Sequence, residues 1–256
     1  MRGRIVEALF PRACAGCRGP GWPFCHDCRS EVAWLTPPGC FRCGRPLLER
    51  VAECSDCPPS PITWARAPFL YAGPIRRALL RLKFAGERSI ADAMAPFVGA
   101  FVDARLAGPA GPMAEGGPFT ITWVPLGRRR RRTRSFDQAE VLARSVAAWV
   151  GAPVRPLLAR VVETDPQARR SAADRRLALE DAFAAVGTAP PSVVLVDDVL
   201  TTGFTSASCA RTLVAAGARS VHVLTAARSL GGPLPARCYN GDGFGPGLWL
   251  PGGILR

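Results

Sequence analysis

The sequence predicts an α/β fold, in which a parallel β-sheet is flanked by helices, with a small cysteine-rich metal module in front of it. Two observations predict this fold class. Eight of the ten cysteines form four C-x-x-C pairs near the N-terminus, and from residue 119 short β-branched runs alternate with segments of helical periodicity. The 256 residues of the chain are enough for one ordinary domain and this additional module.

The composition argues against wholesale disorder and against membrane insertion. Hydrophobic residues make up 48% of the chain, which favours a packed core. No apolar run approaches the roughly 20 residues that cross a bilayer, and the first residues do not resemble a secretory signal, so we expect a cytoplasmic protein. The net charge of +13 allows nucleic acid, phosphates or an acidic partner as ligands. Arginine supplies nearly all of it, so the single lysine, Lys83, suggests a site that needs a compact ammonium group.

The four C-x-x-C pairs predict two zinc sites. Two residues between the cysteines of a pair let both sulfurs face one ion from a tight turn, and two such pairs complete a tetrahedron with no open position. Disulfides do not fit a cytoplasmic protein, a redox motif would occur once, and an iron–sulfur cluster is the remaining alternative to zinc. The predicted ligands are Cys14, Cys17, Cys25, Cys28, Cys40, Cys43, Cys54 and Cys57.

The order of the pairs favours one site from the first two pairs and one from the last two, and crossed pairing is the alternative. His26 lies inside a knuckle and is expected to stay exposed, since thiolates fill the coordination. Residues 1–60 are rich in proline and glycine and have little core of their own. Both ions are therefore expected to be structural and to supply folding energy. Four aromatic residues of the module are expected in its core, with base stacking as the alternative: Trp22, Phe24, Trp34 and Phe41.

Residues 61–228 show the element order of an α/β domain. Its first part predicts a strand over 67–71, a helix from Pro74 to Gly86, and a further helix that Ser89 caps. A connection rich in glycine and proline follows at 107–118. Further strands are predicted at 119–124, within 154–162, at 193–196 and at 221–224, and further helices from Asp137 to Gly151 and from Thr205 to Gly217. Residues 229–256 are expected to form a disordered tail.

The candidate site follows the predicted strand at 193–196, because ligands of such sheets bind at the carboxyl ends of the strands. Asp197 and Asp198 emerge there and offer acceptors for two neighbouring sugar hydroxyls. Gly203 lets the backbone approach a phosphate, and the helix that follows offers free amides and a partial positive charge. These features predict a ribose-phosphate site made of Asp197, Asp198, Thr201, Thr202, Gly203 and Thr205.

Two other interpretations of this segment explain less of it. A phospho-receiver domain also has paired aspartates after a hydrophobic strand, but near its start, whereas here Asp242 is the one acidic residue after Asp198. A simple strand-to-helix turn explains Gly203 and Thr205, but it does not explain two carboxylates and three threonines.

Several motifs taken together resemble the ComF family of competence-associated proteins. Residues 193–205 resemble the phosphoribosyl pyrophosphate loop of type I phosphoribosyltransferases. The other matching motifs are the four C-x-x-C pairs, residues 71–74, residues 82–84, the arginine-rich loop that ends at 136–138, and Gln167. The resemblance covers roughly residues 10–228. It implies a type I phosphoribosyltransferase-like parallel sheet behind a double zinc ribbon.

The resemblance also implies roles for individual residues. The acidic pair would hold the 2′- and 3′-hydroxyls of ribose, and Thr201 to Thr205 the 5′-phosphate. Mg²⁺ would bridge ribose and pyrophosphate oxygens of the ligand. A mobile loop over the site would contain Thr164, Gln167 and Arg175. For the arginines, the alternative is a basic loop that is simply exposed to solvent. The residues expected to face pyrophosphate or a nucleic-acid backbone are Arg128, Arg129, Arg130, Arg131, Arg132 and Lys83.

Two positions depart from the family pattern: Ser135 and Asp137 stand where glycine and asparagine are usual. Serine removes backbone freedom, and the aspartate is expected to add a negative charge near the pyrophosphate. No residue stands out as a general base, so no catalytic residue is predicted.

Two functions therefore compete. One is an enzyme that displaces pyrophosphate from an activated ribose. The other is a binding module that senses a nucleotide precursor or binds single-stranded DNA through its ribbons and arginines. Either function would serve competence or DNA uptake, with phosphoribosyl pyrophosphate, single-stranded DNA and proteins of the competence machinery as expected partners.

Overall fold

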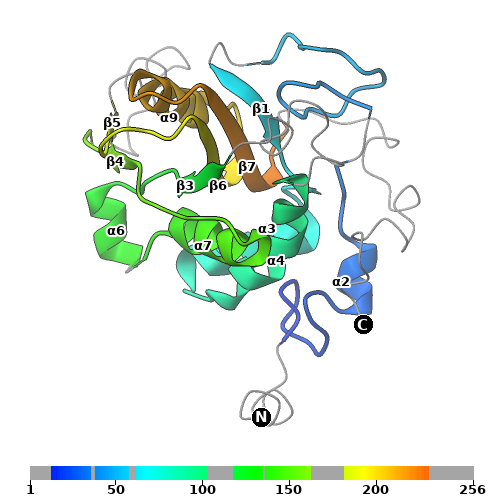
Figure 1. The fold of residues 1–256 in the computed structure, drawn as a ribbon. Coiled ribbons are helices and arrows are strands. Elements are labelled where there is room, and N and C mark those ends of the chain that lie inside the picture. The colour runs from blue at the N-terminus through cyan, green and yellow to red at the C-terminus, as the bar shows by residue number, and fades with distance from the viewer. Residues whose placement is uncertain are drawn as a thin grey trace.

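A computed structural model describes residues 13–35, 38–57, 61–102, 118–134, 136–162 and 182–230, without the side chains of residues 128–130 (Figure 1). Its centre is a sheet in the order β1-β7-β6-β3. The short strand β2 also pairs with β7, further along that strand than β1 does. All pairings within this sheet are parallel. The strands are β1 (Ile62–Arg66), β2 (Phe69–Leu70), β3 (Phe119–Trp123), β6 (Ser192–Leu200) and β7 (Ser220–Arg228).

Helices cover both faces of the sheet. On one face lie α3 (Gly73–Phe84), α4 (Ser89–Gly99), the short 3₁₀ helix η1 (Ala100–Val102) and α7 (Gln138–Val150), and on the other lies α9 (Phe204–Ala215) (Figure 1). Each face has its own apolar cluster, because successive residues of a buried strand point to opposite sides. Val194 and Val196 pack with α3, α4 and α7, whereas Val193 and Leu195 pack against α9. The predicted fold class, a parallel sheet flanked by helices behind a cysteine-rich module, is confirmed.

Some predicted elements differ in extent or in partner. The strand predicted within 154–162 is β4 (Leu158–Arg160), which pairs antiparallel with β5 (Phe183–Ala185) in a separate two-stranded sheet. The helix predicted to have Ser89 as its cap begins at Ser89, so that Arg88 is the N-cap. Strand β1 was not predicted, since its five residues directly follow the proline-rich exit of the cysteine module.

The five adjacent arginines were predicted to lie in a loop, and this is wrong. They open helix α6 (Arg128–Arg134). Arginine is a good helix former, and the run contains neither glycine nor proline to interrupt a helix. In Figure 1, α6 and the helix of the cysteine module, α2 (His26–Ser30), lie at opposite sides of the molecule.

The cysteine module wraps around the end of the sheet domain. Its backbone bonds directly to it, as in the bonds from the Leu35 N–H to the Pro68 carbonyl (2.9 Å) and from the Leu70 N–H to the Ala33 carbonyl (2.9 Å). Within the described ranges, no helix combines the length and the apolar character needed to cross a bilayer.

Candidate functional site

The first cysteine cluster consists of Cys14, Cys17, Cys25 and Cys28, whose sulfurs all lie within 4.8 Å of one another. Cys25 is the N-cap of α2, and its sulfur accepts the N–H of Cys28 at 3.5 Å. The sulfur of Cys14 accepts two further amides, those of Gly16 (3.3 Å) and Cys25 (3.2 Å). Tight turns with amides aimed at sulfur are the geometry that the C-x-x-C spacing predicted.

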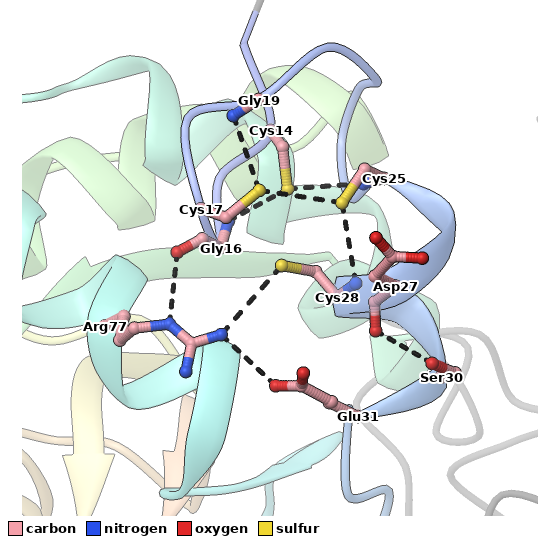
Figure 2. Close-up of polar contacts among 10 residues, drawn as sticks. All are labelled: Cys14, Gly16, Cys17, Gly19, Cys25, Asp27, Cys28, Ser30, Glu31 and Arg77. Carbon is pink, nitrogen blue, oxygen red and sulfur yellow. Dashed lines mark hydrogen bonds and ion pairs between the residues drawn. The ribbon is translucent and has the colours of Figure 1, made fainter.

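This first cluster is attached to the outer side of helix α3 (Figure 2). The Arg77 guanidinium reaches the Gly16 carbonyl (3.4 Å), the Cys28 sulfur (4.0 Å) and the Glu31 carboxylate (3.3 Å). One turn further on, Arg81 donates to the carbonyl of Ala15. Both contacts attach the first cluster to the same helix.

The second cluster consists of Cys40, Cys43, Cys54 and Cys57, which again lie within 4.8 Å of one another. It rests on the edge of the sheet. The Ala65 N–H of β1 donates to the Arg42 carbonyl at 2.7 Å, and the Arg228 guanidinium at the end of β7 donates to the Cys43 carbonyl. Gly44 has φ +68°, and a Cβ there would lie 2.6 Å from the Ala65 carbonyl oxygen, so the knuckle and the strand are in close contact.

Both clusters fit zinc. A tetrahedral site with Zn–S bonds of about 2.3 Å has sulfurs about 3.8 Å apart. The observed separations are 3.6 Å for Cys17–Cys25 in the first cluster, and 3.4 Å for Cys40–Cys57 and 3.8 Å for Cys54–Cys57 in the second. The grouping confirms sequential pairing of the four motifs, and it gives two four-cysteine sites for structural Zn²⁺.

The thiol pKa values explain why these clusters need a cation. Burial raises the pKa of Cys14, but amide hydrogen bonds lower it by more, so that the pKa falls to about 6. For Cys28, burial and the neighbouring cysteines raise the pKa to about 12. Four thiolates therefore do not coexist in one cluster unless a positive ion offsets their repulsion, as a bound zinc ion does.

The remaining side chains of the module serve packing. His26 is exposed, as predicted, with its Nδ1 3.5 Å from the Asp27 carboxylate. Trp34 stacks at 4.6 Å from the ring centroid of Phe69 in the sheet domain, and Phe24 contacts the same ring at 6.4 Å. These aromatic rings join the module to the main core, as the packing interpretation predicted.

The acidic pair lies on a strand that is longer than predicted. Strand β6 continues past Val196, so that Asp197 is in register with Thr225 of β7. Each carboxylate accepts the amide of the next residue, at 2.8 Å for Asp197 and 3.0 Å for Asp198. Burial and the adjacent charge of Asp198 raise the pKa of Asp197 well above its usual value.

Lys83 forms an ion pair with this acidic pair. Its Nζ contacts Oδ2 of Asp198, and both side chains are largely shielded, with 21% and 7% of their surfaces exposed. Lys83 lies in the last turn of α3, so the helix that carries the first cysteine cluster also brings the lysine to the acidic pair. The sequence singled out this lysine but did not indicate its partner.

The segment after the acidic pair has the form of a phosphate-binding turn. Thr201 and Thr202 are exposed, and Gly203 adopts φ +78° as the N-cap of α9. No described side chain caps this helix, so its first amides are left to another acceptor. Thr205 lies in the first turn of the helix.

Helix α6 joins the same edge of the sheet from the other side. The Arg134 guanidinium lies 4.7 Å from the ring centroid of Phe84, the residue after Lys83. Arg131 and Arg132 are exposed, and Arg131 Nη2 is 3.7 Å from the Asp137 carboxylate.

Asp137 was predicted to place a charge near pyrophosphate, but its carboxylate is the N-cap of α7. It accepts the amides of Ala139 (3.0 Å), Glu140 (3.4 Å) and Leu126 (2.7 Å) and is buried. The predicted mobile-loop residues Thr164, Gln167 and Arg175, and the departing position Ser135, lie outside the described residues.

Two arginines near the turn at Thr201–Gly203 were missed by the sequence analysis. Arg42 of the second cluster and Arg228 of β7 line a small hollow together with Thr201, Thr202 and Gly203. A signal for Arg228 was present: it ends a run of buried residues in β7, at the same sheet edge as the acidic pair. Arg42 gave no signal, because nothing in a C-x-x-C knuckle indicates what it packs against.

Comparison with known proteins finds a family that matches the cysteine module and relatives that match most of the chain. The family described as "Double zinc ribbon domain" matches residues 5–58. The "DNA utilization protein YhgH" of Salmonella typhi is 32% identical over 86% of this chain and 98% of its own length. "Competence protein F" of Haemophilus influenzae is 27% identical over 86% and 99% of the two chains, and "Competence protein ComFC" of Bacillus subtilis is 27% identical over 82% and 86%.

Among solved structures, one described as "structure of the allosteric regulatory enzyme of purine biosynthesis" matches 60% of this chain and 30% of its own, with 21% identity and a TM-score of 0.35. The class that the fold and the clusters define is a parallel α/β domain behind a double zinc ribbon. The chain belongs to the ComF family.

Proposed function

We propose that the protein binds phosphoribosyl pyrophosphate, or a closely related ribose phosphate, and that this binding serves the handling of DNA during competence. The observation that carries the proposal is the acidic pair within the last four residues of β6, followed by the glycine turn into α9. The names of the relatives, which concern competence and DNA utilization, support the second part.

The polar groups are arranged in the order of the groups of a ribose 5-phosphate. Asp197 and Asp198 offer carboxylate oxygens to the sugar hydroxyls, and the uncapped N-terminus of α9 offers amides to the phosphate. On the opposite side of the acidic pair, Lys83 and the end of α6 supply positive charge for a pyrophosphate. Mg²⁺ would accompany the pyrophosphate, held mainly by ligand oxygens.

The experiment that tests this proposal is isothermal titration calorimetry with phosphoribosyl pyrophosphate and Mg²⁺. We expect the Asp197→Asn/Asp198→Asn variant to lose at least about ten-fold in affinity, because charge-assisted hydrogen bonds to the diol are weakened. Asp92→Asn is the matched control, since the Asp92 carboxylate accepts the Ser145 hydroxyl (2.8 Å) on the exposed surface of α4. Equal affinities of the double variant and the wild type would overturn the ribose-binding proposal.

The second candidate function is a binding module without turnover that holds single-stranded DNA. Helix α6 favours it, because three arginines of its last four residues carry charge at the sheet edge. A gel shift with single-stranded DNA at several salt concentrations tests this function. Binding that persists, with an unchanged salt slope, after Arg131 and Arg132 are replaced by glutamine would exclude these two arginines as the DNA contact.

Turnover is tested separately, by measuring pyrophosphate release from phosphoribosyl pyrophosphate across a panel of bases. The Asp137 carboxylate caps α7 but still lies 3.7 Å from Arg131 Nη2, so this measurement also tests whether a carboxylate beside the arginine run permits turnover. Pyrophosphate release that is faster with one base than without any base would favour the enzyme. The Asp197→Asn/Asp198→Asn variant would then have to abolish this base-dependent release.

A further inference from the structure

Arg228 is a buried cation whose bonding is incomplete. It is the last residue of β7, it is 5% exposed, and it is in register with Leu200 of β6. Its Nη1 donates to the Cys43 carbonyl, and its Nη2 lies 3.6 Å from the Cys43 sulfur. Its Nε is buried and has no hydrogen-bond partner among the described residues. Leaving such a donor unpaired costs roughly 1–3 kcal/mol, so its position calls for an acceptor.

The surroundings of Arg228 indicate what this acceptor is. The guanidinium lines a hollow of about 20 Å³ whose other walls include Arg42 and Cys43 of the second cluster and Thr201, Thr202 and Gly203 of the phosphate-binding turn. The hollow therefore lies between a zinc site and the N-terminus of α9. On this scale about one water-sized group fits inside, which suits a single oxygen of a phosphate but not a sugar or a base.

One alternative is that Arg228 merely balances the negative charge of the second cluster. Four thiolates and one Zn²⁺ carry a net charge of −2, and a buried arginine beside them offsets part of it. This explains the contacts of Nη1 and Nη2 with Cys43. It does not explain the buried Nε, or the position of the hollow at the end of a helix that no described side chain caps.

We propose that the Arg228 guanidinium donates to an oxygen of the 5′-phosphate of the ligand, so that the second zinc ribbon forms one wall of the phosphate subsite. The subsite takes a phosphate monoester, with Arg42 as a second cation at its rim and the α9 amides opposite. This inference rests on the proposed ribose-phosphate function and deepens it. It also couples the two ligands: because coupling free energies are reciprocal, bound phosphate must raise the affinity of the second cluster for zinc.

The test uses the full chain with two zinc ions bound, and ribose 5-phosphate as the probe in calorimetry. Arg228→Gln removes the charge and keeps a polar side chain of similar reach. Arg66→Gln is the matched control, because Arg66 is a second shielded arginine beside the same cluster, bonded to the Ala65 carbonyl (2.8 Å) and stacked on Phe41, and it does not line the hollow. We expect a loss of at least about ten-fold in affinity for Arg228→Gln and less than about three-fold for Arg66→Gln.

A second measurement does not depend on the Arg228 variant. The wild-type protein is exposed to a chelator with and without ribose 5-phosphate, and native mass spectrometry follows the loss of each zinc ion. Cys28→Ser and Cys43→Ser identify which cluster is protected. We expect the phosphate ester to slow release from the second cluster and to leave the first unchanged. Equal protection of both clusters, or of neither, would overturn the inference.

The outcomes separate this inference from the function on which it rests. If Arg228→Gln and Arg66→Gln keep wild-type affinity while the acidic-pair variant loses it, Arg228 makes no phosphate contact and the ribose-phosphate function stands. If the wild-type protein binds neither ribose 5-phosphate nor phosphoribosyl pyrophosphate, both proposals fail. If Arg228→Gln does not retain two zinc ions, Arg42→Gln at the rim of the hollow takes its place, with an expected loss of about three-fold.

Discussion

The two cysteine clusters have the same ligands and the same local geometry, but they are attached to the sheet domain in different ways. The first is held on the outside of α3 by Arg77 and Arg81. The second lies against β1 and the end of β7, beside the phosphate-binding turn. Two sites with equal chemistry therefore have unequal access to the candidate site.

The difference teaches that each cluster supports a different end of the site. The first acts indirectly, since α3 carries it on one side and brings Lys83 to Asp198, at the proposed ribose end. The second is in direct contact with the turn at Thr201–Gly203, at the proposed phosphate end. We therefore expect damage to the first cluster to weaken the site through α3, and damage to the second to remove one of its walls.

The largest expected effect comes from removing one buried ligand of each cluster, with Cys28→Ser in the first and Cys43→Ser in the second. A structural zinc site contributes about 10–16 kcal/mol of apparent binding free energy, so each variant should lose its own ion. Native mass spectrometry should show one zinc ion per chain for both. Calorimetry should show the greater loss of ribose 5-phosphate affinity for Cys43→Ser, and equal losses would contradict the comparison.

The next effect concerns the link between α3 and the acidic pair. Lys83→Met leaves the shielded Asp198 carboxylate without its partner, which should lower the free energy of unfolding by about 3 kcal/mol at pH 7. In the double variant with Asp198→Asn most of this loss should disappear, because no unpaired charge remains. Urea denaturation of the wild type, both single variants and the double variant gives the coupling. Strict additivity would show that α3 does not support the site through this pair.

A third prediction distinguishes acid damage to the sheet from acid damage to the clusters. His222 of β7 is fully buried, its ring lies 5.1 Å from the Trp64 ring, and burial lowers its pKa to about 4. Below pH 6.5 the His222 imidazole binds a proton in the unfolded chain, whereas in the folded chain it does not accept this proton until about pH 4. Stability should therefore fall by about 3 kcal/mol between these pH values.

The variant His222→Phe removes this titration and keeps an aromatic ring in the same place. Its free energy of unfolding should be flatter than that of the wild type between pH 6.5 and 4, as measured by urea denaturation at each pH. Any acid loss common to both proteins then has a source other than His222, and the clusters, whose thiolates take up protons as zinc leaves, are one such source. Identical pH profiles would mean that His222 does not control the acid stability of the sheet.

The smallest effect comes from a matched pair of glycines. A Cβ on Gly16 would lie 2.6 Å from the Cys28 sulfur, and a Cβ on Gly44 would lie 2.6 Å from the Ala65 carbonyl oxygen, with φ +68° at Gly44. Each alanine variant should lose roughly 1–2 kcal/mol of stability. Gly44→Ala should also weaken ribose 5-phosphate binding, because it moves the second cluster away from the sheet. The comparison would be wrong if Gly16→Ala weakened binding as much.

Much of this protein could be predicted from local patterns. The C-x-x-C spacing predicts four-cysteine clusters because a tight turn brings its own two sulfurs together. Alternating runs from residue 119 predict the sheet and helices, because the 2.0 and 3.6 periods are properties of each segment by itself. The segment from Asp197 to Thr205 indicated a site for the same reason, since the strand, the turn and the helix end are all contained in nine adjacent residues.

Only the tertiary structure decided what these local pieces face. Arg228 and Cys43 are 185 residues apart in the sequence, and their contact depends on the strand order β1-β7-β6-β3. The Lys83–Asp198 pair depends on how α3 packs against this sheet. The role of Asp137 as a cap and the helical form of the arginine run likewise depend on what surrounds them. Periodicity fixes the faces of an element, but the partner of each face follows from the packing of the whole chain, because burial is shared between segments that the sequence does not place next to each other.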